Sequence, residues 1–126
     1  MEELNCEIYV NWEQPDEQLA QIIAEACGGV VRSTPSSTLG VETPHAKVRI
    51  APGPYFHGSR YLAGKDAFLR YPRCLEIYPH SDTQRGEYVG SIAALLESFW
   101  RRGVPAVAAC DFESELPEGG GIDRLH

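Results

Sequence analysis

The apolar residues of this chain recur with two different periods, and this limits the folds that it can adopt. Over residues 6–12, apolar Cys6, Ile8 and Val10 alternate with other residues, the period-two pattern of a strand with one buried face. Over residues 82–102, apolar residues recur at helical spacing and form one broad stripe. A chain with both periods is predicted to pack helices against a sheet.

A first helix is predicted over residues 15–27, where Leu19, Ile22 and Ile23 recur at helical spacing. Acidic residues at its start suit the helix dipole, and a glycine pair follows its end. The remaining strands are predicted at residues 30–32, 46–50, 74–78 and 104–112, with residues 33–44 as a loop and residues 55–71 as an ordered aromatic excursion.

The order of these elements predicts an α+β fold, a ferredoxin-like two-layer sandwich with two helices on one face of a mostly antiparallel sheet of four to five strands. Residues 104–112 are almost continuously apolar, which predicts a strand in mid-sheet or buried on both faces. We expect one domain over residues 1–126, in which residues 113–126, with their acidic and glycine-rich sequence, form a flexible tail.

The formal net charge of −7 over 126 residues argues against nucleic acid and anionic membranes as partners and favours a basic protein. The chain begins with an acidic segment unlike a signal peptide, and its apolar runs are too short to span a membrane. We therefore expect a cytoplasmic protein that is a monomer or a weak dimer.

No recognisable catalytic or cofactor motif is present in the sequence. Phosphate-binding glycine patterns are missing, and the four histidines and four cysteines lack the local spacing of metal ligands. We therefore expect no enzyme activity, no cofactor and no metal. Cys110 next to Asp111 is a conceivable nucleophile, but the parity of its strand favours a thiol in the core.

Basic residues are interleaved with the aromatic residues of 55–71, as in platforms that bind single-stranded nucleic acid. The net charge makes this the weaker interpretation. We expect the excursion either to cover a sheet edge or to contribute aromatic side chains to an interface.

Three features of the chain are similar to those of a known family: the acidic sequence after residues 104–112, the tyrosines expected on the sheet face without helices, and the small size and acidic composition of the whole chain. In these features the chain resembles bacterial immunity proteins of polymorphic or contact-dependent toxin systems. The resemblance implies a stoichiometric inhibitor that covers the active site of a basic toxin such as a nuclease. A ligand-binding or regulatory ferredoxin-like module and a small enzyme remain the alternatives. Strand parity suggests as partner-binding residues Tyr9, Trp12 and Tyr78, surrounded by Glu7, Glu76, Asp111, Glu113 and Glu115.

Overall fold

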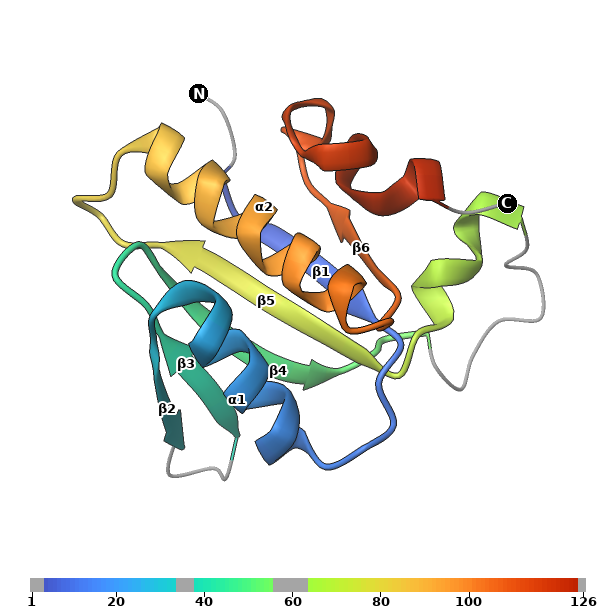
Figure 1. Ribbon diagram of the computed structural model, residues 1–126, viewed down its shortest axis with the longest axis horizontal. Helices are drawn as coiled ribbons and strands as arrows, with labels where there is room; N and C mark the ends of the chain where they lie inside the picture. Colours follow the sequence, from blue (N-terminus) through green and yellow to red (C-terminus); the bar gives the residue numbers. More distant parts are fainter. Residues whose placement is uncertain (1–3, 34–37, 56–63, 125–126) are drawn as a thin grey trace.

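The computed structural model describes residues 4–33, 38–55 and 64–124 of the chain. Within them, two α-helices pack on one face of a six-stranded antiparallel sheet, as Figure 1 shows. The α+β class is therefore as predicted. The strands are β1 (Cys6–Val10), β2 (Val30–Ser33), β3 (Leu39–Glu42), β4 (Ala46–Pro52), β5 (Arg73–Pro79) and β6 (Ala106–Ala109).

Both predicted helices are present. Helix α1 (Asp16–Cys27) starts directly after Pro15 and ends at Gly28, whose left-handed backbone (φ 67°) lets the chain turn away. Helix α2 (Arg85–Arg101) begins three residues later than predicted and buries its apolar stripe against the sheet.

The sheet has six strands in the order β2-β3-β4-β5-β1-β6, so the prediction of four to five strands was wrong. The missing strand is β3, which lies inside the segment predicted as a loop. Only Val41 of its four residues is fully buried, so the strand carries no alternating pattern. Pairing with β4, which places Val41 opposite Val48, defines the strand instead.

Residues on the helix-facing side of the sheet form the main core with the two helices. Tyr88 and Phe99 of α2 are completely buried there, and the hydroxyl of Tyr88 donates a hydrogen bond to the Ile77 carbonyl at 3.3 Å. The strand residues of this core are Cys6, Ile8, Val10, Val41, Ala46, Val48, Ile50, Leu75, Ile77, Ala106 and Ala108.

A second, smaller core lies on the opposite face of the sheet. Tyr9 was predicted to be exposed there, but it is only 5% exposed, so that expectation was wrong. The ring of Phe68, from the 3-10 helix η1 (Gly64–Arg70), packs edge-on against Tyr9 with centroids 5.5 Å apart. Cys74 and Val107 complete this core. The aromatic excursion thus covers part of the sheet face; its residues 56–63 lie outside the described part of the chain.

The last strand and the segment after it also differ from the expectation. Strand β6 is an edge strand and not a mid-sheet strand, but it is buried on both faces, the other alternative that the sequence predicted: Ala106 and Ala108 lie in the main core and Val107 in the second core. The C-terminal segment packs against it (Figure 1). That segment, predicted as a flexible tail, forms the 3-10 helices η2 (Glu113–Glu115) and η3 (Pro117–Arg124). Its Leu116 belongs to the main core. Residues 125–126 of the predicted tail lie outside the described residues.

Candidate partner-binding surface

Carboxylates from three separate parts of the chain meet at one end of the sheet. Glu7 of β1 and Glu76 of β5 are direct cross-strand partners on the face away from the helices. Glu7 also pairs with Ala109 of β6, so the residues that follow β6, Asp111 and Glu113, leave the sheet at this same end. We call Glu7, Glu76, Asp111 and Glu113 the acidic end.

Each carboxylate of the acidic end has a different environment. Glu76 forms an ion pair with Arg49 of β4. Glu113 accepts a hydrogen bond from the backbone N–H of Cys110 at 2.9 Å, and Glu7 accepts one from the Cys74 thiol at 3.3 Å. Among the described residues Asp111 has no ion pair and is exposed.

The pKa of the Cys74 thiol is affected by the carboxylates of the acidic end. Burial raises the pKa of Cys74, and the hydrogen bond to Glu7 and the charges of Glu7 and Glu76 raise it further. Burial disfavours any charge on the thiol, and the two carboxylates disfavour a further negative charge beside their own. The acidic end is therefore a region of negative potential.

A shallow cleft of about 240 Å³ opens beside these carboxylates. Glu7 and Glu76 line it together with Tyr78, whose ring is 42% exposed. Two carboxylates and an exposed aromatic ring suit a Lys or Arg side chain, which gains both charge pairing and a contact with the ring face. The other residues that line the cleft are Asn5, Cys6 and Ile77.

Of the remaining predicted binding residues, Trp12 and Tyr9 lie elsewhere, and Glu115 is held by an ion pair. Trp12 lies beyond the opposite end of β1, where its indole N–H donates to the Pro15 carbonyl at 3.2 Å. Glu115 forms a two-pronged ion pair with Arg85 at the start of α2, with one contact of 2.8 Å. Tyr9 is buried in the second core. The structure thus brings Glu7, Glu76 and Tyr78 together in one cleft, and Asp111 and Glu113 follow β6 at the same end of the sheet.

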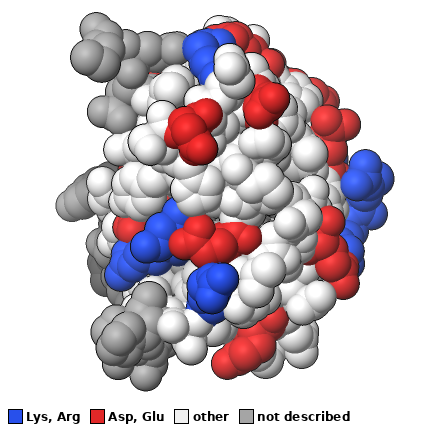
Figure 2. Space-filling model, turned by 90° about the vertical axis from the view of Figure 1, so that its left-hand side faces the viewer, with Lys and Arg blue, Asp and Glu red and all other residues white. Residues whose placement is uncertain are grey.

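Basic residues border the same face of the sheet. Lys47 lies opposite Tyr78, and Arg49 lies opposite Glu76. Strand parity already placed Lys47 and Arg49 on this face, but only the register of β4 against β5 reveals that Arg49 pairs with Glu76. In Figure 2, acidic side chains predominate in the upper half of the view, and basic and acidic side chains lie side by side further down.

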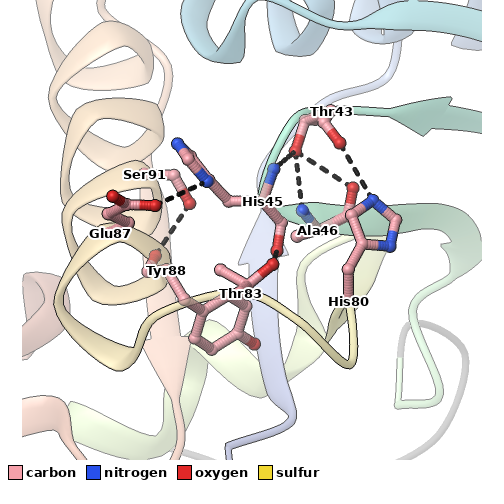
Figure 3. A network of polar contacts seen from close by, with 8 residues as sticks. All are labelled: Thr43, His45, Ala46, His80, Thr83, Glu87, Tyr88 and Ser91. Carbon is pink, nitrogen blue, oxygen red and sulfur yellow. Dashed lines mark hydrogen bonds and ion pairs between the residues drawn. The ribbon is translucent and has the colours of Figure 1, made fainter.

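A polar network joins the β3–β4 turn to the start of α2 at the same end of the sheet (Figure 3). The buried hydroxyl of Thr43 accepts the N–H groups of His45 and Ala46 and donates to the Ala46 carbonyl at 3.0 Å. Thr83 donates to the His45 carbonyl, also at 3.0 Å. These bonds satisfy the polar backbone of the turn, so the network fixes the position of the turn.

The two described histidines of this network point to different sides, as Figure 3 shows. His45 Nδ1 lies 3.4 Å from a carboxylate oxygen of Glu87, and His80 Nε2 lies 2.9 Å from the Thr43 carbonyl oxygen. Over the described ranges no group of three or more His, Cys, Asp or Glu is placed to hold a metal ion. His57 and His126 lie outside those ranges.

No family model, curated protein or solved structure matches the chain. In the part of the chain that the structure describes, none of the helices has the length and apolar character needed to cross a membrane.

Proposed function

We propose that this chain is a protein-binding inhibitor of the immunity-protein kind, which docks its acidic end on the basic active-site surface of a toxin. The observation that supports this most directly is the cleft in which Glu7 and Glu76 lie beside the exposed Tyr78, with Asp111 and Glu113 following β6 at the same end of the sheet. Carboxylates so arranged speed the encounter with a cationic surface, and an aromatic side chain at the centre of the contact slows dissociation.

We also infer that the scaffold is a ferredoxin-like sandwich with an added hairpin. The strand order β6-β1-β5-β4, with α1 after β1 and α2 between β5 and β6, supports this interpretation. The hairpin of β2 and β3 then extends the sheet beyond β4. In this arrangement Glu7 and Glu76 of the acidic end lie on central strands of the sheet, which gives a rigid binding surface.

The experiment compares capture of proteins from a lysate of the source cells by the wild-type chain and by the double variant Glu7→Lys/Asp111→Lys. Glu76, Glu113 and Glu115 are left unchanged because each holds an ion pair or a backbone N–H. A captured basic protein is then purified and titrated. We expect a one-to-one complex whose affinity falls with salt and falls at least about tenfold in the variant.

The matched control is Glu13→Lys/Glu17→Lys, which makes the same change in net charge at exposed positions beyond the opposite end of β1. If the complex depends on the acidic end, this control binds like the wild type. Equal weakening by both double variants would mean that only net charge matters, and the proposed surface would be wrong. A folded chain that captures no basic protein from cells expressing the toxin would contradict the inhibitor function itself.

A second candidate function, a ligand-binding module, is favoured by one pocket of about 310 Å³. Trp100, Val104 and Tyr71 contribute to its lining, and the guanidinium of Arg124 lies 4.6 Å from the centre of the Trp100 ring. Such a volume suits a small, mostly apolar ligand with an anionic group. A screen of aromatic carboxylic acids tests it, because a true ligand raises the thermal midpoint of the wild type but not of Trp100→Ala.

A further inference from the structure

Two of the four cysteines lie opposite each other across the β1–β6 pair. The pairing of the two strands ends with Glu7 opposite Ala109, and Cys6 and Cys110 are the next residues beyond this last pair. Both thiols are free, and each shifts the pKa of the other, so the two side chains are close neighbours. Directly opposed residues of antiparallel strands have Cα atoms about 4.5–5.5 Å apart, which is within the range that a disulfide spans.

We propose that Cys6 and Cys110 form a redox modification site, at which a small-molecule disulfide such as oxidised glutathione converts the two thiols into an intramolecular disulfide. Cys110 is the attacking thiol and Cys6 the resolving thiol. The pair lies where β1 meets the turn that carries Asp111 and Glu113, so the new bond ties this turn to the sheet.

The surroundings of the two sulfur atoms assign these roles. Cys110 is partly exposed, whereas Cys6 is almost completely buried. The hydrogen bond from the Cys6 thiol and a second one from the backbone of Phe112 lower the pKa of Cys110, although burial and the charges of Glu113 and Asp111 oppose them. A lower pKa leaves more of the reactive thiolate.

Cys6 has the opposite character before the reaction. The hydrogen bond to Cys110 raises its pKa most, and burial and the charges of Cys110, Glu113 and Glu7 add to that effect. Two of these causes depend on the negative charge of Cys110. They disappear once Cys110 is capped, so Cys6 becomes easier to deprotonate when its thiolate is needed.

The reaction balances in two steps. The Cys110 thiolate attacks one sulfur of the small-molecule disulfide, its S–S bond breaks, and one thiolate leaves. Cys6 then loses its proton to solvent and attacks the Cys110 sulfur of the mixed disulfide, expelling the second thiolate. The protein thiols lose two electrons, which reduce the small-molecule disulfide to two thiols.

The other two cysteines provide an internal comparison. Burial raises the pKa of Cys27 to about 11, and its thiol donates to the Ser91 carbonyl. Cys74 lies on the opposite face of the sheet, beside Glu7. In the described sheet Cys74 lies opposite Tyr9 and Ala51, and Cys27 lies at the end of α1, so neither is opposite another cysteine in a strand pair.

The test treats the reduced full-length chain with oxidised glutathione and maps the disulfides by mass spectrometry. We expect a loss of two hydrogen atoms and a link between the peptides of Cys6 and Cys110, also in the variant Cys27→Ser/Cys74→Ser. Cys6→Ala is expected to accumulate glutathione on Cys110, because the resolving thiol is missing. With the native chain, iodoacetamide is expected to label Cys110 at least about tenfold faster than Cys27.

Oxidation is also expected to raise the denaturant midpoint of the wild type, since the disulfide closes a ring over most of the chain. For Cys110→Ser, oxidation is expected to leave the denaturant midpoint unchanged. Because Cys110 is partly exposed, this variant is expected to fold, so the test remains valid even if Cys6→Ala does not fold. A folded wild type that forms no Cys6–Cys110 link, or labelling of Cys27 as fast as Cys110, would overturn the proposal.

Discussion

The two edge strands of the sheet have the same length, four residues, but opposite surroundings. Strand β6 is almost entirely buried, whereas every residue of β2 is exposed. Val30 of β2 is 58% exposed and Val107 of β6 only 1% exposed, although both are valines on edge strands. Burial in this fold is therefore determined by what covers an edge and not by the strand alone.

The cover of β6 comes from the C-terminal segment and from α2. Gly121 of η3 approaches the strand so closely that a Cβ atom there would lie 2.6 Å from the Ala106 carbonyl oxygen. That same oxygen accepts a hydrogen bond from the Trp100 indole at 3.0 Å. At the other end of β6, the carboxylate of Glu113 accepts the N–H of Cys110. Side chains thus replace the missing neighbouring strand.

Strand β2 limits its exposure in another way. It is short, it carries the charged Arg32, and it is the outer strand of a hairpin. The other strand of that hairpin, β3, contacts α1. Short and charged edges resist edge-to-edge association even without a cover. One edge of the sheet therefore contributes to folding stability, and the other contributes little.

The sharpest test of this contrast makes the same substitution at both edges. Val107→Lys places a charge in the second core beside Tyr9 and Phe68, and we expect it to lower the free energy of unfolding by at least about 3–4 kcal/mol. Val30→Lys is expected to change it by less than about 0.5 kcal/mol. Urea unfolding followed by circular dichroism measures both. Similar losses would show that the two edges do not differ in energy.

The next prediction concerns the glycines of η3. Gly121 has φ +108°, and a Cβ atom would also lie 3.1 Å from the Trp100 ring. Gly121→Ala combines backbone strain with this clash, so we expect a loss of about 2–3 kcal/mol in the free energy of unfolding. Urea unfolding measures this loss.

Gly103→Ala is the matched control, because Gly103 also has positive φ (+75°) but nothing lies within 4 Å of its added Cβ. It isolates the strain, and we expect about 1 kcal/mol. If Gly121→Ala were no worse than this control, the C-terminal segment would not be pressed against β6.

These comparisons explain which parts of the fold the sequence predicts. The period of the apolar residues locates α1, α2, β1, β4 and β5, because each of them buries one face against the main core. The apolar run at β6 has the same appearance whether a strand or a C-terminal segment covers it, so the sequence predicted burial on both faces correctly but could not distinguish a mid-sheet strand from this covered edge strand. Residues 117–124 look like a linker, yet their glycines allow the positive φ angles that close packing needs.

The candidate site follows the same rule. Strand parity places Glu7, Glu76 and Tyr78 on one face, and the structure keeps them together. Tyr9 has the same parity but is covered by Phe68, which is far away in the sequence. The pairing of Cys6 with Cys110 depends on which strand neighbours β1, and this is information that periodicity does not contain.

The smallest expected effect tests a single hydrogen bond of the covered edge. Trp100→Phe keeps most of the ring but removes the N–H that satisfies the Ala106 carbonyl, and it weakens the contact with Arg124. We expect a loss of about 1 kcal/mol in the free energy of unfolding, measured by urea unfolding.

Trp12→Phe is the matched control, since the indole of Trp12 also donates to a carbonyl, that of Pro15, but at an exposed site. Water replaces the lost hydrogen bond there, so we expect a loss below about 0.5 kcal/mol. Equal losses in the free energy of unfolding for the two tryptophan variants would mean that solvent reaches the β6 edge as easily as it reaches the surface. The C-terminal segment would then cover this edge without excluding water from it.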